Sequence, residues 1–227
     1  MASSTISPVR IATISDTIYE YLLESIISGK IPPGTPLTMQ GLAEQFDVSL
    51  MPVRDALKKL EAVNVIERGK NRRVVVRLLS IDDFEELLEI RMHLEILAAR
   101  KAARNATEQS LRELKRIAAE TEKTRNMISF VEKNAQFHQT IYHTAKSPIL
   151  QDIIDGLWLR LKPYLHIYAS CRTEHRTADK LHAGILEGML KRDEKKVSDF
   201  LRRDLEHGAA SVIAVLKKRP EVIQAES

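Results

Sequence analysis

The sequence predicts a mostly α-helical protein of two domains, and three observations support this fold class. Apolar residues recur at spacings of three and four along most of the chain, which is the period of an amphipathic helix. Two short β-branched runs, Val65–Ile66 and Val74–Val76, are the only segments expected to form strands. The length of 227 residues suffices for two cores. We therefore expect a first domain in residues 1–78, an all-α domain in residues 79–219 and a tail in residues 220–227.

Composition restricts the cellular context of the protein. A single cysteine cannot form an intrachain disulfide, which favours a reducing compartment. No apolar run approaches the length of a membrane span, and Asp16, Glu20 and Glu24 interrupt the N-terminal segment where a signal peptide would be apolar. We therefore expect a soluble cytoplasmic protein that has no membrane partner.

Three short helices are predicted in the first domain. The first covers about Ser15 to Ser28, where apolar residues recur at helical spacing and Gly29 ends the pattern. Residues 30–37, KIPPGTPL, contain three prolines and should form an extended connector that is neither a helix nor a central strand. Two more helices then follow, Met39 to Gln45 and Leu50 to Ala62, joined by a tight turn.

The last of these helices has a well-marked start. Ser49 is expected to cap it by accepting a backbone N–H, and Pro52 falls in the first turn, where an amide has no intrahelical partner to lose. With the phase set in this way, the buried stripe consists of Val53, Ala56, Leu57 and Leu60.

The opposite face of this helix carries side chains suited to DNA. The expected contacts are Ser49, Leu50, Met51, Arg54 and Lys58, together with Gln40 on the preceding helix. A short helix braced on another, with a basic outer face, has the geometry that enters a major groove. Arg54 is the strongest single candidate for a base or phosphate contact. The alternative reading of these two helices is an ordinary solvated hairpin.

The two β-branched runs bracket a basic tip and predict a hairpin. The candidate phosphate contacts at the tip are Arg68, Lys70, Arg72 and Arg73. Between residues 52 and 77, eight basic residues stand against three acidic ones, and this excess of five exceeds the net charge of +4 of the whole chain. Three helices followed by a basic hairpin predict a winged helix-turn-helix that binds double-stranded DNA.

The second domain is predicted to contain six helices and no strands. The expected helices run from Ser80 to about Ala103, from Thr107 onward, from a Ser129–Glu132 capping box to His143, from Ser147 onward, from about Ala178 to Lys191, and from about Glu194 to Leu216. Pro163 is expected to kink or interrupt the fourth helix.

Four polar residues on these helices form a candidate site. Asn134 and His138 are four residues apart and share one face of the third helix. His182 and Asp204 lie near the middles of the fifth and sixth helices. If these faces converge, two imidazoles, a carboxylate and an amide oxygen make an acceptable set for a divalent ion such as zinc, nickel or manganese. The alternative is a metal-free pocket lined by hydrogen-bonded histidines.

Two further residues are candidates for binding a small-molecule effector. Arg91 lies on a mostly apolar helix side, where its guanidinium could hold a small carboxylate in a bidentate manner. Its alternative role is a structural ion pair with Glu95, one turn further on. Tyr142 shares a helix face with His138 and could supply a hydroxyl to the pocket, whereas Trp158 is expected to be a packing or surface residue.

These residues resemble a known family of regulators. The N-terminal part resembles the winged helix of GntR-family transcription regulators in Tyr21 to Gly29, Pro33-Gly34, Leu42-Ala43, Val48-Ser49 and Pro52 to Leu57, followed by Leu60. The C-terminal part is similar to the FCD effector domain of the FadR branch, in its six-helix VanR type, in Glu89 to Arg91 with Glu95, Ala98-Ala99, Asn134 to His138, Leu181-His182 and Ile185-Leu186. Together the two resemblances cover nearly the whole chain.

The resemblance implies a homodimer in which the effector domains make the dimer contact and two readers meet the half-sites of a near-palindromic operator. It also implies that the four site residues converge. Members of the family that bind metal have Asp at the position of Asn134 and histidines at those of His138, His182 and Asp204, so two of the four positions differ here. His207, one turn further on, is the alternative ligand on the sixth helix.

Three departures concern the DNA reader. An arginine that family members commonly have after Val-Ser is Leu50 here, a position that is often basic is Gln40, and the usual wing-tip glycine is Arg73. Because arginine is the usual bidentate reader of guanine, we expect base readout to be shared differently, with methyl contacts from Leu50 and Met51.

The sequence therefore predicts a DNA-binding transcription regulator, either a repressor or an activator. A small metabolite, expected to be a carboxylate, would bind in the helical domain, directly or through a divalent metal. One alternative is a metal-responsive regulator without an organic effector. Another is a metal-dependent enzyme with a DNA-targeting module, but the sequence offers no general base positioned beside a nucleophile.

Overall fold

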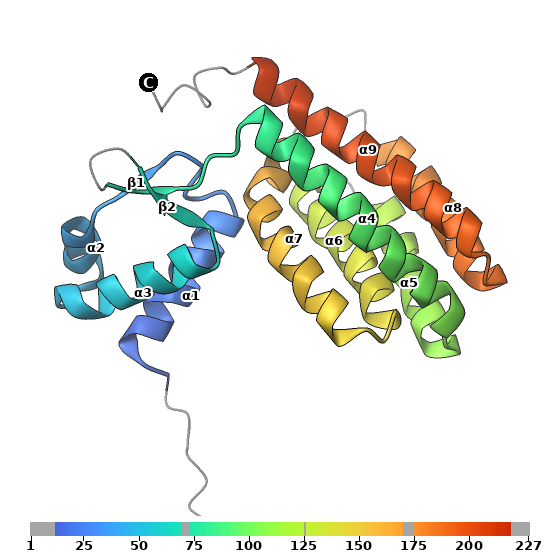
Figure 1. Cartoon of the computed structure of the whole chain (residues 1–227), viewed down its shortest axis with the longest axis horizontal. Helices are drawn as coiled ribbons and strands as arrows, with labels where there is room; N and C mark the ends of the chain where they lie inside the picture. The colour runs from blue at the N-terminus through green and yellow to red at the C-terminus, as the bar shows by residue number, and fades with distance from the viewer. Residues whose placement is uncertain (1–11, 70–72, 125, 170–174, 219–227) are drawn as a thin grey trace, which may run out of the picture. The chain divides into compact units, whose positions relative to one another are not determined.

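The computed structural model describes residues 12–69, 73–124, 126–169 and 175–218 (Figure 1). The chain divides into two compact units, Met1–Arg77 and Leu78–Ser227. Among the described residues the first unit combines helices with a small sheet, and the second consists of helices alone. The predicted fold class is therefore confirmed.

The first unit packs three helices with a three-stranded sheet. Its elements are α1 (Ile14–Ile27), β1 (Pro36–Leu37), α2 (Met39–Phe46), α3 (Leu50–Ala62), β2 (Ile66–Arg68) and β3 (Val74–Val76). The sheet is antiparallel with the order β1-β3-β2, and Glu67 pairs with Val75 at the centre of the hairpin. Residues 70–72, at the tip of the wing, lie outside the described residues.

The strand β1 corrects the expectation that only the hairpin would form strands. Pro36 and Leu37 pair with Val75 and Val74. Pro36 is compatible with this strand because β1 lies at the edge of the sheet, where a residue without an N–H removes no ladder bond from a central strand. Val65 was expected to begin the hairpin, but it precedes β2: its N–H bonds to Leu60 at the end of α3, while its carbonyl accepts from Arg77 just after β3.

The start of α3 agrees with prediction in position but not in its cap. Asp47 ends α2 in a left-handed conformation, with φ of 52°, a conformation that aspartate tolerates better than most residues. Ser49 is the N-cap residue, yet its side chain makes no capping hydrogen bond. The predicted stripe of α3 is buried, and α3 packs on α1, where Ile18 and Leu22 are also buried.

The second unit is a bundle of long helices. They are α4 (Ile81–Asn105), α5 (Glu108–Lys123), α6 (Met127–Thr144), α7 (Pro148–Ala169), α8 (His175–Lys191) and α9 (Glu194–Lys218). No helix within the described ranges is long and apolar enough to cross a membrane.

One local expectation for this unit was wrong, and a second, that Pro163 would kink or interrupt its helix, was wrong as to the interruption. The cap of α6 is Asn126, whose side chain accepts from the backbone N–H of Ser129, so the expected Ser129–Glu132 capping box does not start the helix. Pro163 does not interrupt α7, which continues to Ala169. Proline removes only one intrahelical donor, and the buried packing of Leu161 and Tyr164 on either side stabilises the helix there.

Close packing of α8 on α9 brings the two C-terminal site residues together. A Cβ atom at Gly184 would lie 2.1 Å from the Phe200 ring, and one at Gly188 would lie 2.7 Å from the Val197 side chain. The two glycines therefore permit an approach of the helices that larger residues would prevent. His182 on α8 and Asp204 on α9 are both buried as a result.

Candidate functional site

The outer face of α3 is exposed, and its composition is unusual for a solvated helix. Leu50 and Met51 are 54% and 55% exposed. Arg54 and Lys58 lie beside them on the same face, and among the described residues each pairs with Asp55, at 3.9 and 3.7 Å. Two large apolar side chains and two weakly paired cations on one helix face suit contacts with thymine methyl groups, guanine edges and phosphates.

The remaining predicted DNA contacts differ in their ion pairing, and two of them are not described by the structure. Gln40 and Ser49 are exposed, and Arg73 is exposed at the start of β3. Arg68 is exposed but forms a bidentate pair with Glu61, with N–O distances of 2.9 and 3.3 Å. Predicted contacts Lys70 and Arg72 lie outside the described residues.

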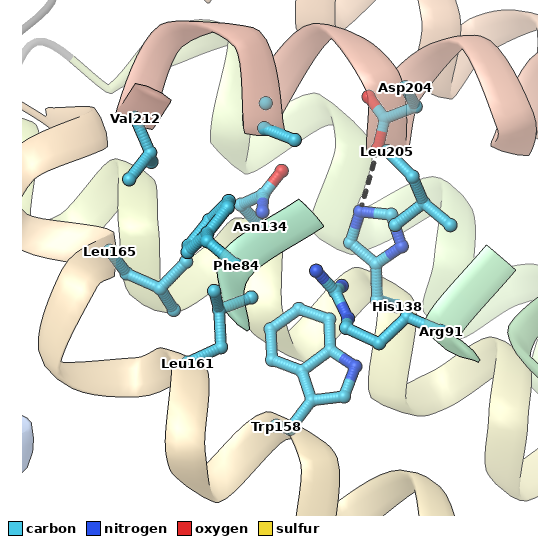
Figure 2. A pocket seen from close by; sticks show the side chains of 12 residues that line it. Phe84, Arg91, Asn134, His138, Trp158, Leu161, Leu165, Asp204, Leu205 and Val212 are labelled. Atoms are coloured by element: carbon cyan, nitrogen blue, oxygen red, sulfur yellow. Dashed lines mark ion pairs between the residues drawn. The ribbon is translucent and has the colours of Figure 1, made fainter. Parts of the chain in front are cut away.

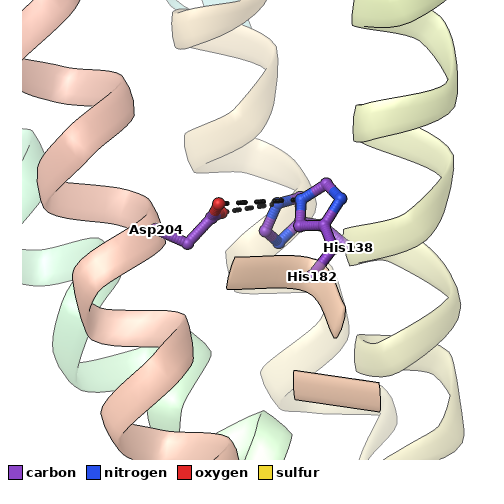
Figure 3. A group of neighbouring side chains, drawn as sticks. All are labelled: His138, His182 and Asp204. Carbon is purple, nitrogen blue, oxygen red and sulfur yellow. Dashed lines mark ion pairs between the residues drawn. The ribbon is translucent and has the colours of Figure 1, made fainter. Parts of the chain in front are cut away.

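Three of the four predicted ligand residues converge in the helical unit, as Figure 3 shows. His138 Nε2 lies 3.0 Å from Asp204 Oδ2, and His182 Nε2 lies 3.6 Å from Asp204 Oδ1. All three side chains are buried, and their ligand atoms lie within 4.8 Å of one another. Asn134 lines the adjoining pocket beside His138, while His207 does not belong to the cluster.

The electrostatics of the cluster favour neutral imidazole beside carboxylate. Burial lowers the pKa of His182 to about 4, so this ring is neutral at neutral pH. Burial acts to raise the pKa of Asp204, but the charge of His182 and the hydrogen bond and charge of His138 outweigh it and lower that pKa. Neutral imidazole and ionised carboxylate are the protonation states that coordinate a metal ion.

The geometry of the cluster fits a divalent ion. Two ligand atoms about 2.1 Å from one ion stand about 3.0 Å apart at a right angle and about 3.4 Å apart at the tetrahedral angle. The observed separations of 3.0 and 3.6 Å are close to these values but end on different oxygens of Asp204, so coordination of one ion requires a small movement of these side chains. Within the described part of the chain, neither ring nitrogen of His182 has a hydrogen-bond partner, although Phe137 stacks on the ring at 4.3 Å. A bound ion would supply a partner for His182 Nε2, the buried ring nitrogen that faces Asp204.

A buried carboxylate, Glu95, organises the side chains next to the cluster. It accepts from Arg91 Nε at 2.6 Å and Nη2 at 3.4 Å, from Trp158 Nε1 at 3.1 Å, and from the Tyr142 hydroxyl. The Arg91 guanidinium also lies over the Trp158 ring, 5.0 Å from its centroid. Burial and the Glu95 charge raise the pKa of Tyr142 well above its usual value, so the hydroxyl remains a donor.

The pocket next to the cluster opens between four helices and has about 500 Å³ of space, including solvent at its mouth. It is lined by Phe84, Arg91, Asn134, His138, Trp158, Leu161, Leu165, Asp204, Leu205, Gly208, Ala209 and Val212 (Figure 2). The predicted effector residues Arg91, Asn134, His138 and Asp204 therefore border one space. Tyr142 and His182 do not line it, because they lie in the buried layer behind.

The sequence showed only part of the role of two residues in this site. Glu95 was considered only as a partner of Arg91, and Trp158 only as a packing or surface residue. The spacing of four between Arg91 and Glu95 signalled their pair, but no sequence feature linked Glu95 to Trp158 and Tyr142 on other helices.

A unit of three helices and a small sheet with an exposed basic and apolar face on α3, joined to an all-α unit with a buried polar site, is typical of transcription regulators that carry a separate effector domain. Comparison with known families makes this assignment specific. Residues 14–76 match the family described as bacterial regulatory proteins, gntR family, and residues 86–207 match the FCD domain. The chain belongs to the GntR family and carries an FCD domain, and it is therefore a transcription regulator.

Individual relatives agree with this assignment. The transcriptional regulator McbR of Escherichia coli is 33% identical over 141 residues, which are 61% of this chain and 64% of McbR. The transcriptional repressor RspR of the same species is 27% identical over 88% of this chain and 89% of its own. The solved structure of E. coli McbR/YncC superposes with a TM-score of 0.76 and 26% identity, covering 92% of this chain and 99% of that one. These relatives are named as regulators rather than enzymes.

Proposed function

We propose that this protein is a homodimeric transcriptional repressor whose affinity for operator DNA is controlled by a small carboxylate bound in the FCD domain. One observation carries the effector part: Arg91, Asn134, His138 and Asp204 border a single pocket at its junction with the His138–His182–Asp204 cluster. Repression is supported by relatives named as repressors, including RspR and the gluconate operon repressor of Bacillus licheniformis.

Each residue of the pocket would make a different contact with the effector. A divalent ion held by His138, His182 and Asp204 would supply a Lewis-acidic centre for one carboxylate oxygen. Arg91, held in place by Glu95 and Trp158, offers a cation for the other oxygen. Asn134 can donate or accept one further hydrogen bond. The effector changes operator affinity only if it binds two arrangements of the dimer with different affinities.

The proposal is tested by measuring operator binding in three states of the protein. The states are metal-stripped, metal-loaded, and metal-loaded with a panel of carboxylic acids. A metabolite sensor should change its operator affinity on addition of one acid while metal is saturating. A response to metal alone, with no acid effective, would instead support the metal-responsive alternative.

Arg54→Ala is expected to lower the affinity for operator DNA by about tenfold or more, because one bidentate base contact contributes about 1–3 kcal/mol. Binding should be measured by fluorescence anisotropy at several salt concentrations. Arg112→Ala is the matched control, because Arg112 is an exposed arginine on α5. Its replacement removes the same charge, but from the other unit. Equal affinity of Arg54→Ala and the wild type would refute the assignment of α3 as the reader.

The dimer part of the proposal is supported by an apolar strip on the helical unit. Ile90 and Leu97 on α4 are 41% and 44% exposed, and Ile149 and Ile153 on α7 are 78% and 48% exposed. The two helices are neighbours and antiparallel, because Lys101 near the end of α4 bonds to Ser147 at the start of α7. We propose that this strip packs against the same strip of a second copy.

Charge complementarity favours a second copy as the occupant. The first half of α4 exposes Asp82, Glu86 and Glu89, whereas its last turns expose Arg100 and Arg104, which share an ion pair with Glu194 at the start of α9. A two-fold axis through the middle of the strip would place the acidic half of one α4 against the basic half of its partner.

Ile153→Asp is expected to raise the dimer dissociation constant by about 30-fold or more, because a charge would be buried at the centre of an apolar contact. Sedimentation velocity over a range of concentrations measures this constant. Ile128→Asp is the control, since Ile128 is equally exposed, at 58%, but lies on α6. A monomeric wild type, or an Ile153→Asp variant that dimerises normally, would contradict the proposed interface.

A further inference from the structure

The pocket of the helical unit has two chemically different ends. Figure 2 shows His138, Asp204 and Arg91 gathered on one side, with Phe84 and Leu165 on the other. The apolar end is formed by Phe84, Leu161, Leu165, Ala209 and Val212. None of these five side chains has a hydrogen-bond donor or acceptor, and the Asn134 amide beside Phe84 is the one polar group that the described lining residues place at this end.

Gly208 on α9 joins the two ends. Asp204, Gly208 and Val212 are spaced by four and therefore share one face of the helix. A Cβ atom added at Gly208 would meet no heavy atom within 4 Å. Glycine is the least favourable residue other than proline inside a helix, and the packing of this unit does not require it here. The absent side chain leaves the floor of the pocket open between the polar and the apolar end.

The polar end is arranged for a single carboxylate. Glu95 accepts hydrogen bonds from Nε and Nη2 of Arg91, and the Trp158 ring covers one face of the guanidinium. Arg91 therefore has few donors left for binding several anionic groups. Nη1 is the guanidinium nitrogen that Glu95 leaves unbonded, so one carboxylate oxygen is the contact that this end can offer through Arg91.

We propose that the effector is an amphipathic monocarboxylate. Its carboxylate binds at the end formed by Arg91, His138 and Asp204, and its aliphatic or aromatic body passes over Gly208 to lie against Phe84 and Val212. Sugar acids and tricarboxylates should bind more weakly, because several hydroxyl or carboxylate groups would lose water at the apolar end, where Asn134 offers a single amide as partner. This inference rests on the proposed function and specifies the ligand class of the same site.

The first test is calorimetric titration of the Zn²⁺-loaded full-length protein with acetate, butyrate, hexanoate, benzoate, gluconate and citrate. Affinity should rise by about fourfold for each added methylene that reaches the apolar end, since burying one methylene contributes about this factor. Benzoate should bind more tightly than acetate. Equal affinity along the series, or tighter binding of citrate or gluconate than of hexanoate, would overturn the inference.

The second test uses Gly208→Val with Ala210→Val as its control, because Ala210 is exposed on the same helix and does not line the pocket. Gly208→Val should keep its affinity for acetate, lose at least about tenfold in affinity for hexanoate and benzoate, and melt no lower than the wild type. Ala210→Val should bind all of these acids normally. Unchanged hexanoate binding by Gly208→Val would overturn the inference.

The two levels of the proposal fail differently. If gluconate or citrate binds and weakens operator binding, the effector function stands and the amphipathic ligand class is wrong. If none of the six acids binds, acetate included, the carboxylate function itself fails and the inference fails with it. Operator binding by the acid-free protein is measured separately and remains a test of the DNA reader alone.

Discussion

Replacing Glu95 with alanine is expected to lower the free energy of unfolding of the helical unit by about 3–5 kcal/mol, because it leaves a buried guanidinium without its counter-charge. Arg91 and Glu95 are only 6% and 0% exposed. The Tyr142 hydroxyl and the Trp158 indole would lose the same acceptor, and each unsatisfied buried donor adds to the loss.

The measurement can be confined to the helical unit. Trp158 is the only tryptophan of the chain and donates to Glu95, so its fluorescence during urea unfolding reports on this region. Glu95→Gln retains an acceptor of similar size and should cost less than Glu95→Ala. The double variant Arg91→Met, Glu95→Leu removes both charges together and should recover part of the lost stability. A loss below about 1 kcal/mol in Glu95→Ala would show that the network does not stabilise the fold.

His138→Ala is expected to lower the affinity for a divalent ion by about 100-fold or more, because it removes a direct ligand, whereas supporting residues around metal sites typically contribute 10–100-fold. His182→Ala and Asp204→Ala should have similar effects, since each offers one ligand atom to the same cluster. Within the wild type, zinc and nickel should bind more tightly than manganese, following the general order of divalent-ion affinities.

Competition with a chromophoric chelator measures these affinities. His143→Ala is the matched control, since His143 lies on the same helix as His138 but is exposed. Saturating metal should also raise the melting temperature of the wild type and of His143→Ala, because the ion binds only the folded state. Stoichiometric binding retained by both His138→Ala and Asp204→Ala would place the metal elsewhere, and no binding by the wild type would make this a metal-free pocket.

The sequence was sufficient to predict most helices and strands, because the apolar patterns and caps that indicate them lie within each segment. The stripe Val53, Ala56, Leu57 and Leu60 defined the bounds of α3, and helical periodicity with caps at Ser80 and Thr107 located α4 and α5. The predictions that failed also concern single positions, where the position in the sheet or a competing cap decided the structure. An edge position allowed Pro36 into a strand, and a better cap one turn earlier started α6 at Met127.

The chemical types in the site were determined by the sequence itself. It showed Asn134 and His138 on one helix face and Arg91 within reach of Glu95, since residues four apart in a helix are neighbours. It also placed the DNA-contacting candidates on the outer face of α3 with Ser49 before it, on the basic hairpin, and at Gln40 of α2. The resemblance to the GntR family added the expectation that the site residues converge, and the structure brings His138, His182 and Asp204 together.

Only the tertiary structure decided what these residues do together. Packing of α8 on α9 sets the 3.6 Å separation between His182 and Asp204, and the convergence of three helices makes Glu95 an acceptor for Arg91, Tyr142 and Trp158. The open space at Gly208 is likewise a property of its surroundings. Spacing along the chain determines which side chains share a helix face, but distances between helices depend on how whole surfaces pack against one another.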